Sequence, residues 1–146
     1  MNIQFQTCAH PKDLSHECEV FVKEWGYWSW EELNNALKTG NYILYCAQLE
    51  KQIVAALLVM VAVDIMDVIY IYTHPSHRGK KLALMLLQEC ERKCKESGVV
   101  KRVFLEVRKD NIAAQKLYDA FGMKEINVRT KYYNDGCDAL IYSKEV

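Results

Sequence analysis

Hydrophobic positions in the first forty residues recur every three or four residues, which is the spacing of an amphipathic helix. One such pattern follows Pro11 and predicts a first helix. Another follows Ser29, which forms with Glu32 the S-x-x-E pattern of a capping box, and it ends at Gly40, a residue type favoured after helix C-termini. Two helices are therefore expected before the first strand.

The period of the pattern then changes to that of β-structure. Residues 41–49 and 52–63 are mostly apolar, and residues 67–73 are rich in β-branched and aromatic side chains. These runs predict three consecutive strands, with a tight connection at Glu50–Gln52 between the first two.

The second half of the chain alternates helical and strand patterns. A long helix that begins near residue 82 is expected to end at Gly98. A strand, a helix and two closing strands are predicted over residues 101–108, 111–121, 125–133 and 138–146. The order α-α-β-β-β-α-β-α-β-β predicts a mixed sheet covered by helices, that is, an α/β or α+β layered domain.

Composition narrows the class of protein. The 146 residues fit a single domain, residues 1–146, and the 51% of apolar residues argue against disorder. Lys and Arg (19) balance Asp and Glu (19), without the basic excess of a nucleic-acid binder. The longest apolar run is shorter than the about 20 residues that a bilayer span requires, and the N-terminus lacks a secretory pattern. We expect a cytoplasmic protein with no direct nucleic-acid or membrane partner.

The six cysteines form no C-x-x-C pair, and their spacing matches no usual metal framework. Free cysteine packs as a small hydrophobe. We therefore expect reduced, structural cysteines and no metal site. The six are Cys8, Cys18, Cys46, Cys90, Cys94 and Cys137.

The stretch YTHPSHRGKKLALMLL, residues 72–87, places His77, Arg78, Lys80 and Lys81 where a helix is predicted to begin. Cations are unfavourable there because a helix N-terminus carries positive partial charge. A strand, a short basic loop with a glycine and a helix N-terminus together form an arrangement that binds phosphate. The cluster is either a solvated basic patch or the site of a multiply charged anion. ATP and NAD are not expected, because their glycine patterns are absent.

Within this stretch, RGKKLA, residues 78–83, resembles the Q/R-x-x-G-x-G/A loop of the GCN5-related N-acetyltransferases (GNAT), with Lys81 in place of the usual glycine. LEVRKDNIAAQKLYDAFGM, residues 105–123, is similar to the L-E-V-R-x-x-N-x-x-A-x-x-L-Y-x-x-x-G-F pattern of the ribosomal-protein-alanine N-acetyltransferases (RimI type), with methionine for phenylalanine at the end. WSWEEL, residues 28–33, and the R-x-x-Y-Y of residues 129–133 extend the resemblance.

The resemblance implies a mixed, mostly antiparallel sheet, splayed at the cofactor site and flanked by about four helices. It implies acetyl-CoA as acetyl donor, with the pantetheine arm along the strand and the pyrophosphate at the basic loop. We expect the Lys81 side chain to turn outward, or along the phosphates, while its backbone N–H is kept. The implied cofactor-binding residues are Ile71, Tyr72, Thr73, Arg78, Gly79, Lys80, Lys81, Leu82, Ala83, Leu84 and Asn111.

Two residues are candidates for proton transfer. Glu106 lies in an apolar strand, where a carboxylate is costly unless it is solvated or paired, so an ion pair with Arg108 or a nearby lysine is one interpretation. The resemblance implies the other, a general base that takes the proton of the attacking amine through a water molecule. Tyr118 would be a core aromatic from its spacing alone, and the resemblance implies that it protonates the departing thiolate. Asn111 is the expected N-cap of its helix, and His74 is interpreted as a turn residue.

The resemblance implies that the acceptor is a protein N-terminus, the alanine of a small-subunit ribosomal protein. Lys81, and Tyr27 where relatives commonly have proline, leave open an enzyme that acetylates lysines or a small amine. A non-catalytic acyl-CoA-binding module is a further alternative, and the oligomeric state is not predicted. The implied acceptor-site residues are Trp28, Arg129, Tyr132, Tyr133 and Asp138.

Overall fold

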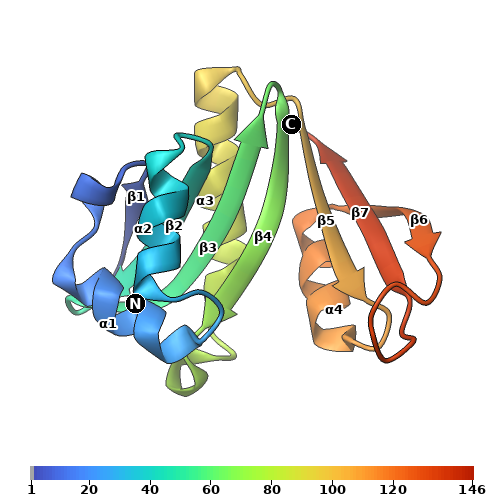
Figure 1. Cartoon of the computed structure of the whole chain (residues 1–146), viewed down its shortest axis with the longest axis horizontal. Helices are drawn as coiled ribbons and strands as arrows, with labels where there is room; N and C mark the ends of the chain where they lie inside the picture. The colour runs from blue at the N-terminus through green and yellow to red at the C-terminus, as the bar shows by residue number, and fades with distance from the viewer. Residues whose placement is uncertain (1) are drawn as a thin grey trace.

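A computed structural model describes residues 2–146, which form one seven-stranded sheet in the order β1-β2-β3-β4-β5-β7-β6 (Figure 1). Neighbouring strands are antiparallel except β4 and β5, which are parallel. The strands are β1 (Ile3–Cys8), β2 (Tyr42–Leu49), β3 (Gln52–Ala62), β4 (Ile65–Thr73), β5 (Arg102–Arg108), β6 (Lys124–Arg129) and β7 (Ala139–Glu145). The helices are α1 (His16–Trp25), α2 (Trp30–Lys38), α3 (Leu82–Ser97) and α4 (Ile112–Phe121), with 3-10 turns η1 (Pro11–Asp13) and η2 (Pro75–His77). The predicted mixed, mostly antiparallel sheet with four helices is confirmed.

The helix boundaries follow the local signals in the sequence. Ser29 Oγ accepts a hydrogen bond from Glu32 N at 3.0 Å, and the Glu32 carboxylate accepts one from Ser29 N at 3.2 Å, which completes the predicted capping box. Asn111 caps α4 by accepting from Ala114 N, and Gly98 ends α3 in the left-handed conformation. Helix ends in this chain are thus determined by residues close in the sequence.

Two predictions about strands were wrong. The chain begins with strand β1, which pairs with β2 and precedes both helices. Only Cys8 of this edge strand is fully buried, so its hydrophobic signal is weak. At the other end, β6 stops at Arg129 instead of continuing to residue 133. Lys131 there has a φ of 51° and donates its backbone N–H to Asp138, which turns the chain out of the strand.

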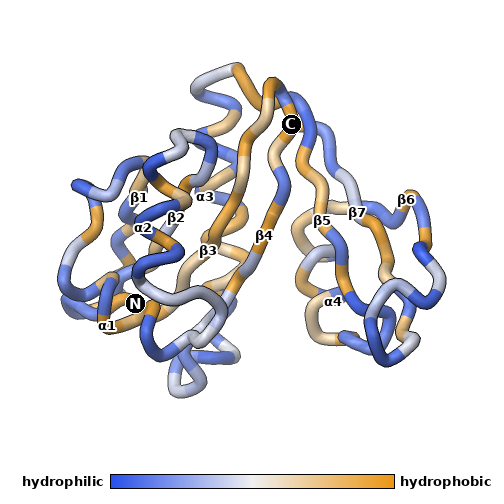
Figure 2. Tube along the Cα trace, in the orientation of Figure 1, coloured by the Kyte–Doolittle hydropathy of each residue, from blue (hydrophilic) through white to orange (hydrophobic). Residues whose placement is uncertain are grey.

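The sheet is covered on both faces. Tyr45 and Ala47 of β2 belong to the hydrophobic cluster that contains the buried face of α3, whereas Leu44 and Cys46 belong to the cluster formed with α1 and α2. This alternation is the period of two that a strand imposes on its side chains. Figure 2 shows β3, in the middle of this half of the sheet, as hydrophobic along most of its length. Helix α4 packs on the part of the sheet formed by β5 and β7 (Figure 1).

All six cysteines are free, and five of them are buried in these two clusters, which confirms their structural role. Cys137 is the half-buried exception. None of the helices within residues 2–146 combines the length and the hydropathy that a bilayer crossing requires.

The sheet is splayed between β4 and β5. The two strands pair only from Ile65 opposite Arg102 to Asp67 opposite Phe104, and then move apart (Figure 1). At the same level β4 carries a β-bulge, because its pairing with β3 passes from Val68 to Tyr70 and skips Ile69. A bulge bends a strand and increases its local twist. The later part of β4 therefore has no partner strand on its β5 side.

Candidate active site

A cleft of about 750 Å³ lies where β4 and β5 have moved apart. Its walls are the end of β4, the loop from η2 to the first turn of α3, and α4; we call it the β4–α4 cleft. Every residue that the sequence implied for cofactor binding lines it, except Lys80. The structure adds side chains outside the implied cofactor set, among them Lys116 and Leu117 of α4 and His77, which the sequence had already placed in the basic cluster. Its volume is in the range of ligand sites, about 300–1,000 Å³.

The loop before α3 adopts a conformation that favours glycine at two positions. Gly79 has a φ of 81°, and Lys81, the N-cap of α3, has a φ of 61°. A left-handed backbone costs a residue with a side chain roughly 1–2 kcal/mol. Lys81 thus keeps the backbone conformation expected of the glycine it replaces, while its exposed side chain lines the cleft. The first N–H groups of α3 remain available, because a helix leaves them without intrahelical partners.

Arg78 is held in place without its charge being neutralised, and the lysines of the loop are not neutralised either. Arg78 Nε donates a hydrogen bond to the Thr73 carbonyl at 3.1 Å, and its guanidinium lies 5.6 Å from the centre of the Tyr72 ring. Among the described residues, Arg78, Lys80 and Lys81 form no ion pair with a carboxylate. The positive end of α3 and its basic loop therefore form a site suited to an anion.

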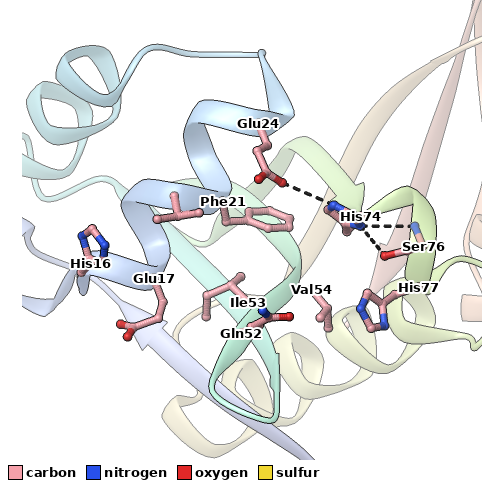
Figure 3. A pocket seen from close by; sticks show the side chains of 11 residues that line it. His16, Glu17, Phe21, Glu24, Gln52, Ile53, Val54, His74, Ser76 and His77 are labelled. Atoms are coloured by element: carbon pink, nitrogen blue, oxygen red, sulfur yellow. Dashed lines mark hydrogen bonds and ion pairs between the residues drawn. The ribbon is translucent and has the colours of Figure 1, made fainter.

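His74 precedes this loop and lines a separate cavity of about 310 Å³ between α1, the start of β3 and η2 (Figure 3). Its Nδ1 accepts a hydrogen bond from Ser76 N at 3.2 Å and caps η2. Its Nε2 lies 3.4 Å from Glu24 Oε2, so it also connects the turn to α1. The interpretation of His74 as a turn residue is confirmed.

A second cleft, of about 570 Å³, begins at the last β4–β5 pair, Asp67 opposite Phe104, and extends to residues just beyond it on both strands. We call it the tyrosine cleft, after Tyr27 from the α1–α2 connection and Tyr132 and Tyr133 from the segment after β6. Its remaining walls come from β4, β5, the end of β6 and β7. The cleft brings together four residues that the sequence singled out: Glu106, Arg129, Tyr132 and Tyr133.

Trp28 and Asp138, also predicted for the acceptor site, do not line this cleft. Trp28 is half-buried and stacks on Tyr27, with 5.7 Å between the ring centres. The Asp138 carboxylate accepts a hydrogen bond from Lys131 N at 2.9 Å, which fixes the turn after β6. Trp28 therefore supports Tyr27, and Asp138 supports the turn after β6, without lining the cleft.

Glu106 is paired, although not with the residue that the sequence suggested. Its Oε1 lies 3.4 Å from Arg129 Nη1, and its side chain is 35% exposed. A hydrogen bond with the Glu106 carboxylate raises the pKa of Tyr132 above its ordinary value. Arg108 instead pairs with Asp110 and Asp135. The pairing of Glu106 therefore depends on β6 and the segment after it, and not on its neighbours in β5.

Tyr118 lies in the core, with 7% of its surface exposed, and lines neither cleft. Burial raises the pKa of Tyr118 to about 12, so its hydroxyl keeps its proton at neutral pH. That burial is the one cause of the shift, with no contribution from a hydrogen bond. Within residues 2–146 no fully buried side-chain N or O atom lacks a hydrogen-bond partner. The Tyr118 oxygen therefore retains some access to the surface.

The sequence did not assign Tyr27 or Asp67 to the acceptor site, although both line the tyrosine cleft. Tyr27 stacks on Tyr70 with 4.1 Å between ring centres and 5° between ring planes. Burial, and after it the Glu106 carboxylate, raise the pKa of Asp67 above its ordinary value. The only signal in the sequence was an acidic residue at the start of a strand, which does not indicate the face on which its side chain lies.

Comparison with known proteins agrees with this geometry. Over 133 residues, 89% of the chain and 87% of the relative, the chain is 29% identical to a Bacillus subtilis protein provisionally named ribosomal protein bS18-alanine N-acetyltransferase. The crystal structure of the ribosomal-protein-S18-alanine N-acetyltransferase from Escherichia coli matches with a TM-score of 0.80 at 23% identity, over 99% of this chain and 94% of that one. Arabidopsis thaliana NAA60 in complex with acetyl-CoA also matches with a TM-score of 0.80, at 14% identity and over 99% of both chains.

These structural matches show a shared fold. The sequence profile of the acetyltransferase (GNAT) family goes further, because it matches residues 8–123, which include the loop before α3, β5 and α4. The chain belongs to the acetyltransferase (GNAT) family and is an acetyl-CoA-dependent N-acetyltransferase.

Proposed function

We propose that this enzyme acetylates the N-terminal α-amino group of a protein, with the alanine terminus of a ribosomal protein as the preferred acceptor. The observation that carries the proposal is that the two clefts follow one another along β4. Asp67 to Ile69 line the tyrosine cleft, and Ile71 to Thr73 line the β4–α4 cleft. A donor in one cleft and an acceptor in the other would meet beside the bulge at Ile69. The name of the Bacillus subtilis relative supports the choice of acceptor.

Acetyl-CoA binds in the β4–α4 cleft. The unpaired side of β4 offers backbone groups from Ile71 to Thr73 to the pantetheine arm, in the manner of a strand added to a sheet edge. The pyrophosphate lies at the α3 N-terminus, where Arg78, Lys81 and the free N–H groups neutralise its charge. Asn111, which lines the same cleft, contacts the pantetheine from the start of α4.

The reaction is a direct transfer between the two clefts. Glu106 accepts a proton from the amine through a water molecule, and the amine nitrogen attacks the thioester carbonyl. The carbon–sulfur bond then breaks, the acetyl group remains on the nitrogen, the nitrogen loses its second proton to water, and Tyr118 gives its proton to the coenzyme A thiolate. Tyr118 regains a proton from solvent. Holding donor and acceptor together supplies much of the rate enhancement, and the two proton transfers supply the rest.

Arg129, Tyr132 and Tyr133 form the acceptor wall. The ion pair with Arg129 fixes the position of the Glu106 carboxylate. Trp28 and Asp138 act indirectly, by holding Tyr27 and the turn after β6.

Acetyl-CoA-dependent release of free thiol, measured on a panel of peptides, tests the proposal. The panel contains a peptide that begins with alanine, the same peptide with a blocked N-terminus, and a blocked peptide that carries a lysine. We expect turnover only with the free alanine terminus, and mass spectrometry should locate the acetyl group there. Turnover of the blocked lysine peptide would still support acetyl transfer to an amine, but it would contradict the N-terminal α-amino group as the acceptor. Acetyl-CoA binding with no turnover of any peptide would contradict a protein N-terminus as acceptor and favour a small amine.

A further inference from the structure

The tyrosine cleft holds two carboxylates on adjacent strands. Asp67 lies opposite Phe104 in the last pair formed by β4 and β5, and Glu106 is two residues further along β5. Side chains two residues apart on a strand lie on the same face, so Asp67, Phe104 and Glu106 share one face of the sheet. All three line the cleft. Like charges on neighbouring strands are destabilising, so the arrangement requires an explanation.

The two carboxylates differ in their partners. Glu106 has Arg129 Nη1 at 3.4 Å, and its carboxylate is close enough to Tyr132 to raise the pKa of that side chain. Asp67 takes part in no ion pair and in no side-chain hydrogen bond among the described residues, although its side chain is half-buried. A half-buried charge without a partner is unfavourable in the free enzyme. A cation bound in the cleft would remove this cost.

We propose that Asp67 is the counter-ion of the acceptor's ammonium group, and that the amine enters the tyrosine cleft as a cation held between Asp67 and Glu106. This inference rests on the proposed function, which places the acceptor in this cleft. The chemistry suits an α-amino group, whose ordinary pKa of about 7.7–8.0 leaves it mostly protonated at neutral pH. With one arginine and two carboxylates facing the cleft, its side chains carry a net negative charge that favours such a ligand.

The role of Asp67 differs from that of Glu106. Glu106 removes the proton that must leave before attack, whereas Asp67 stays ionised and holds the nitrogen beside the thioester. Acetylation turns the ammonium into a neutral amide. The contact with Asp67 is then lost, so the same residue that attracts the substrate favours release of the product.

The test compares Asp67→Asn with the wild type by steady-state kinetics on whichever acceptor of the peptide panel is turned over. The variant keeps the shape of the side chain and removes its charge. We expect KM for the acceptor to rise at least about tenfold, kcat to change less than about threefold, and KM for acetyl-CoA to stay the same. Asp67→Glu, which restores the charge, should recover part of the affinity. Asp64→Asn, an exposed aspartate in the β3–β4 turn outside the cleft, is the matched control.

Calorimetry on the coenzyme A-bound enzyme separates this inference from the proposed function, because it requires no turnover. The probes are the alanine peptide with a free N-terminus and its N-acetylated form, and thermal melting confirms that each variant is folded. We expect the wild type to bind the free peptide at least about tenfold more tightly, and Asp67→Asn to lose this preference. An unchanged preference in the variant, or a variant that loses kcat with KM intact, would overturn the role of Asp67. Failure of the wild type to acetylate the alanine peptide would overturn only the acceptor assignment.

Discussion

The two clefts along β4 have opposite charge. In the β4–α4 cleft, Arg78 and Lys81 lie at the positive end of α3. In the tyrosine cleft, Asp67 and Glu106 lie on the same face of adjacent strands, with Arg129 as the one cation among the lining residues. In each cleft, like charges lie close together, and their repulsion is unfavourable in the free enzyme. The comparison suggests that a protein keeps like charges close together where a ligand of opposite charge binds between them. Here the proposed ligands are the phosphates of the donor and the ammonium group of the acceptor.

Glu106→Gln should have the largest effect, because it removes the proposed general base while keeping the shape of the side chain. We expect kcat to fall about 10³-fold, with the affinity for acetyl-CoA unchanged because Glu106 lies outside the β4–α4 cleft. Steady-state kinetics and calorimetry measure the two quantities. Glu125→Gln on the exposed strand β6 is the control. A variant with near wild-type kcat would assign the proton transfer to another group.

Tyr118→Phe removes a hydroxyl to which no hydrogen bond is assigned, so the free energy of unfolding should change by less than about 0.5 kcal/mol. We expect kcat to fall about 10²-fold, because the departing thiolate loses its proton donor. Since burial raises the pKa of Tyr118 to about 12, the wild-type enzyme keeps this proton below that pH. Loss of the Tyr118 proton should therefore reduce kcat only as the pH approaches about 12. A variant with unchanged kcat would leave Tyr118 with a packing role alone.

Added salt should affect ligand binding in the two clefts to different extents. Added KCl shortens the distance over which exposed charges interact, from about 10 Å at 0.1 M to about 3 Å at 1 M. The donor carries several charges and the amine one, so KM for acetyl-CoA should rise several-fold across this range, and KM for the acceptor should rise less. Initial rates at each salt concentration measure both. Equal sensitivity of the two constants would contradict the assignment of the cationic site to the donor.

Lys81 should show the smallest effect. Lys81→Gly relieves a left-handed strain of roughly 1–2 kcal/mol and adds about 0.5–1 kcal/mol of unfolded-state entropy, so stability should rise slightly. Lys81→Val, which is β-branched, should lower stability instead. KM for acetyl-CoA should rise about two- to threefold in both variants through the lost charge. Urea unfolding and initial rates measure these changes, and a stable valine variant would show that the loop tolerates another conformation.

The β4–α4 cleft was largely predictable because it is nearly continuous in the sequence. The end of β4, η2 and the first turn of α3 follow one another from Ile71 to Leu84. Helix caps and basic loops act on groups a few residues away, so a local pattern is sufficient to recognise them. Asn111 was predicted as the N-cap of α4 from an equally local pattern.

The tyrosine cleft was predicted only in part, because its walls come from five separate segments. Tyr27 and Asp67 were not assigned to it from the sequence. The ion partner of Glu106 is Arg129, and not Arg108 in its own strand, because β7 pairs with both β5 and β6. Strand β1 was missed for a similar reason, since its place is determined by pairing with β2 and its own pattern is weak.

The sequence by itself determined the helices and their caps, the succession of strands along the chain from β2 onward, and the basic loop before α3. Each of these depends on residues within a few positions of one another. Only the tertiary structure decided that Asp67 and Glu106 would face one cleft beside Arg129. Strand register and splaying bring these residues together, and both result from packing between segments that are far apart in the chain.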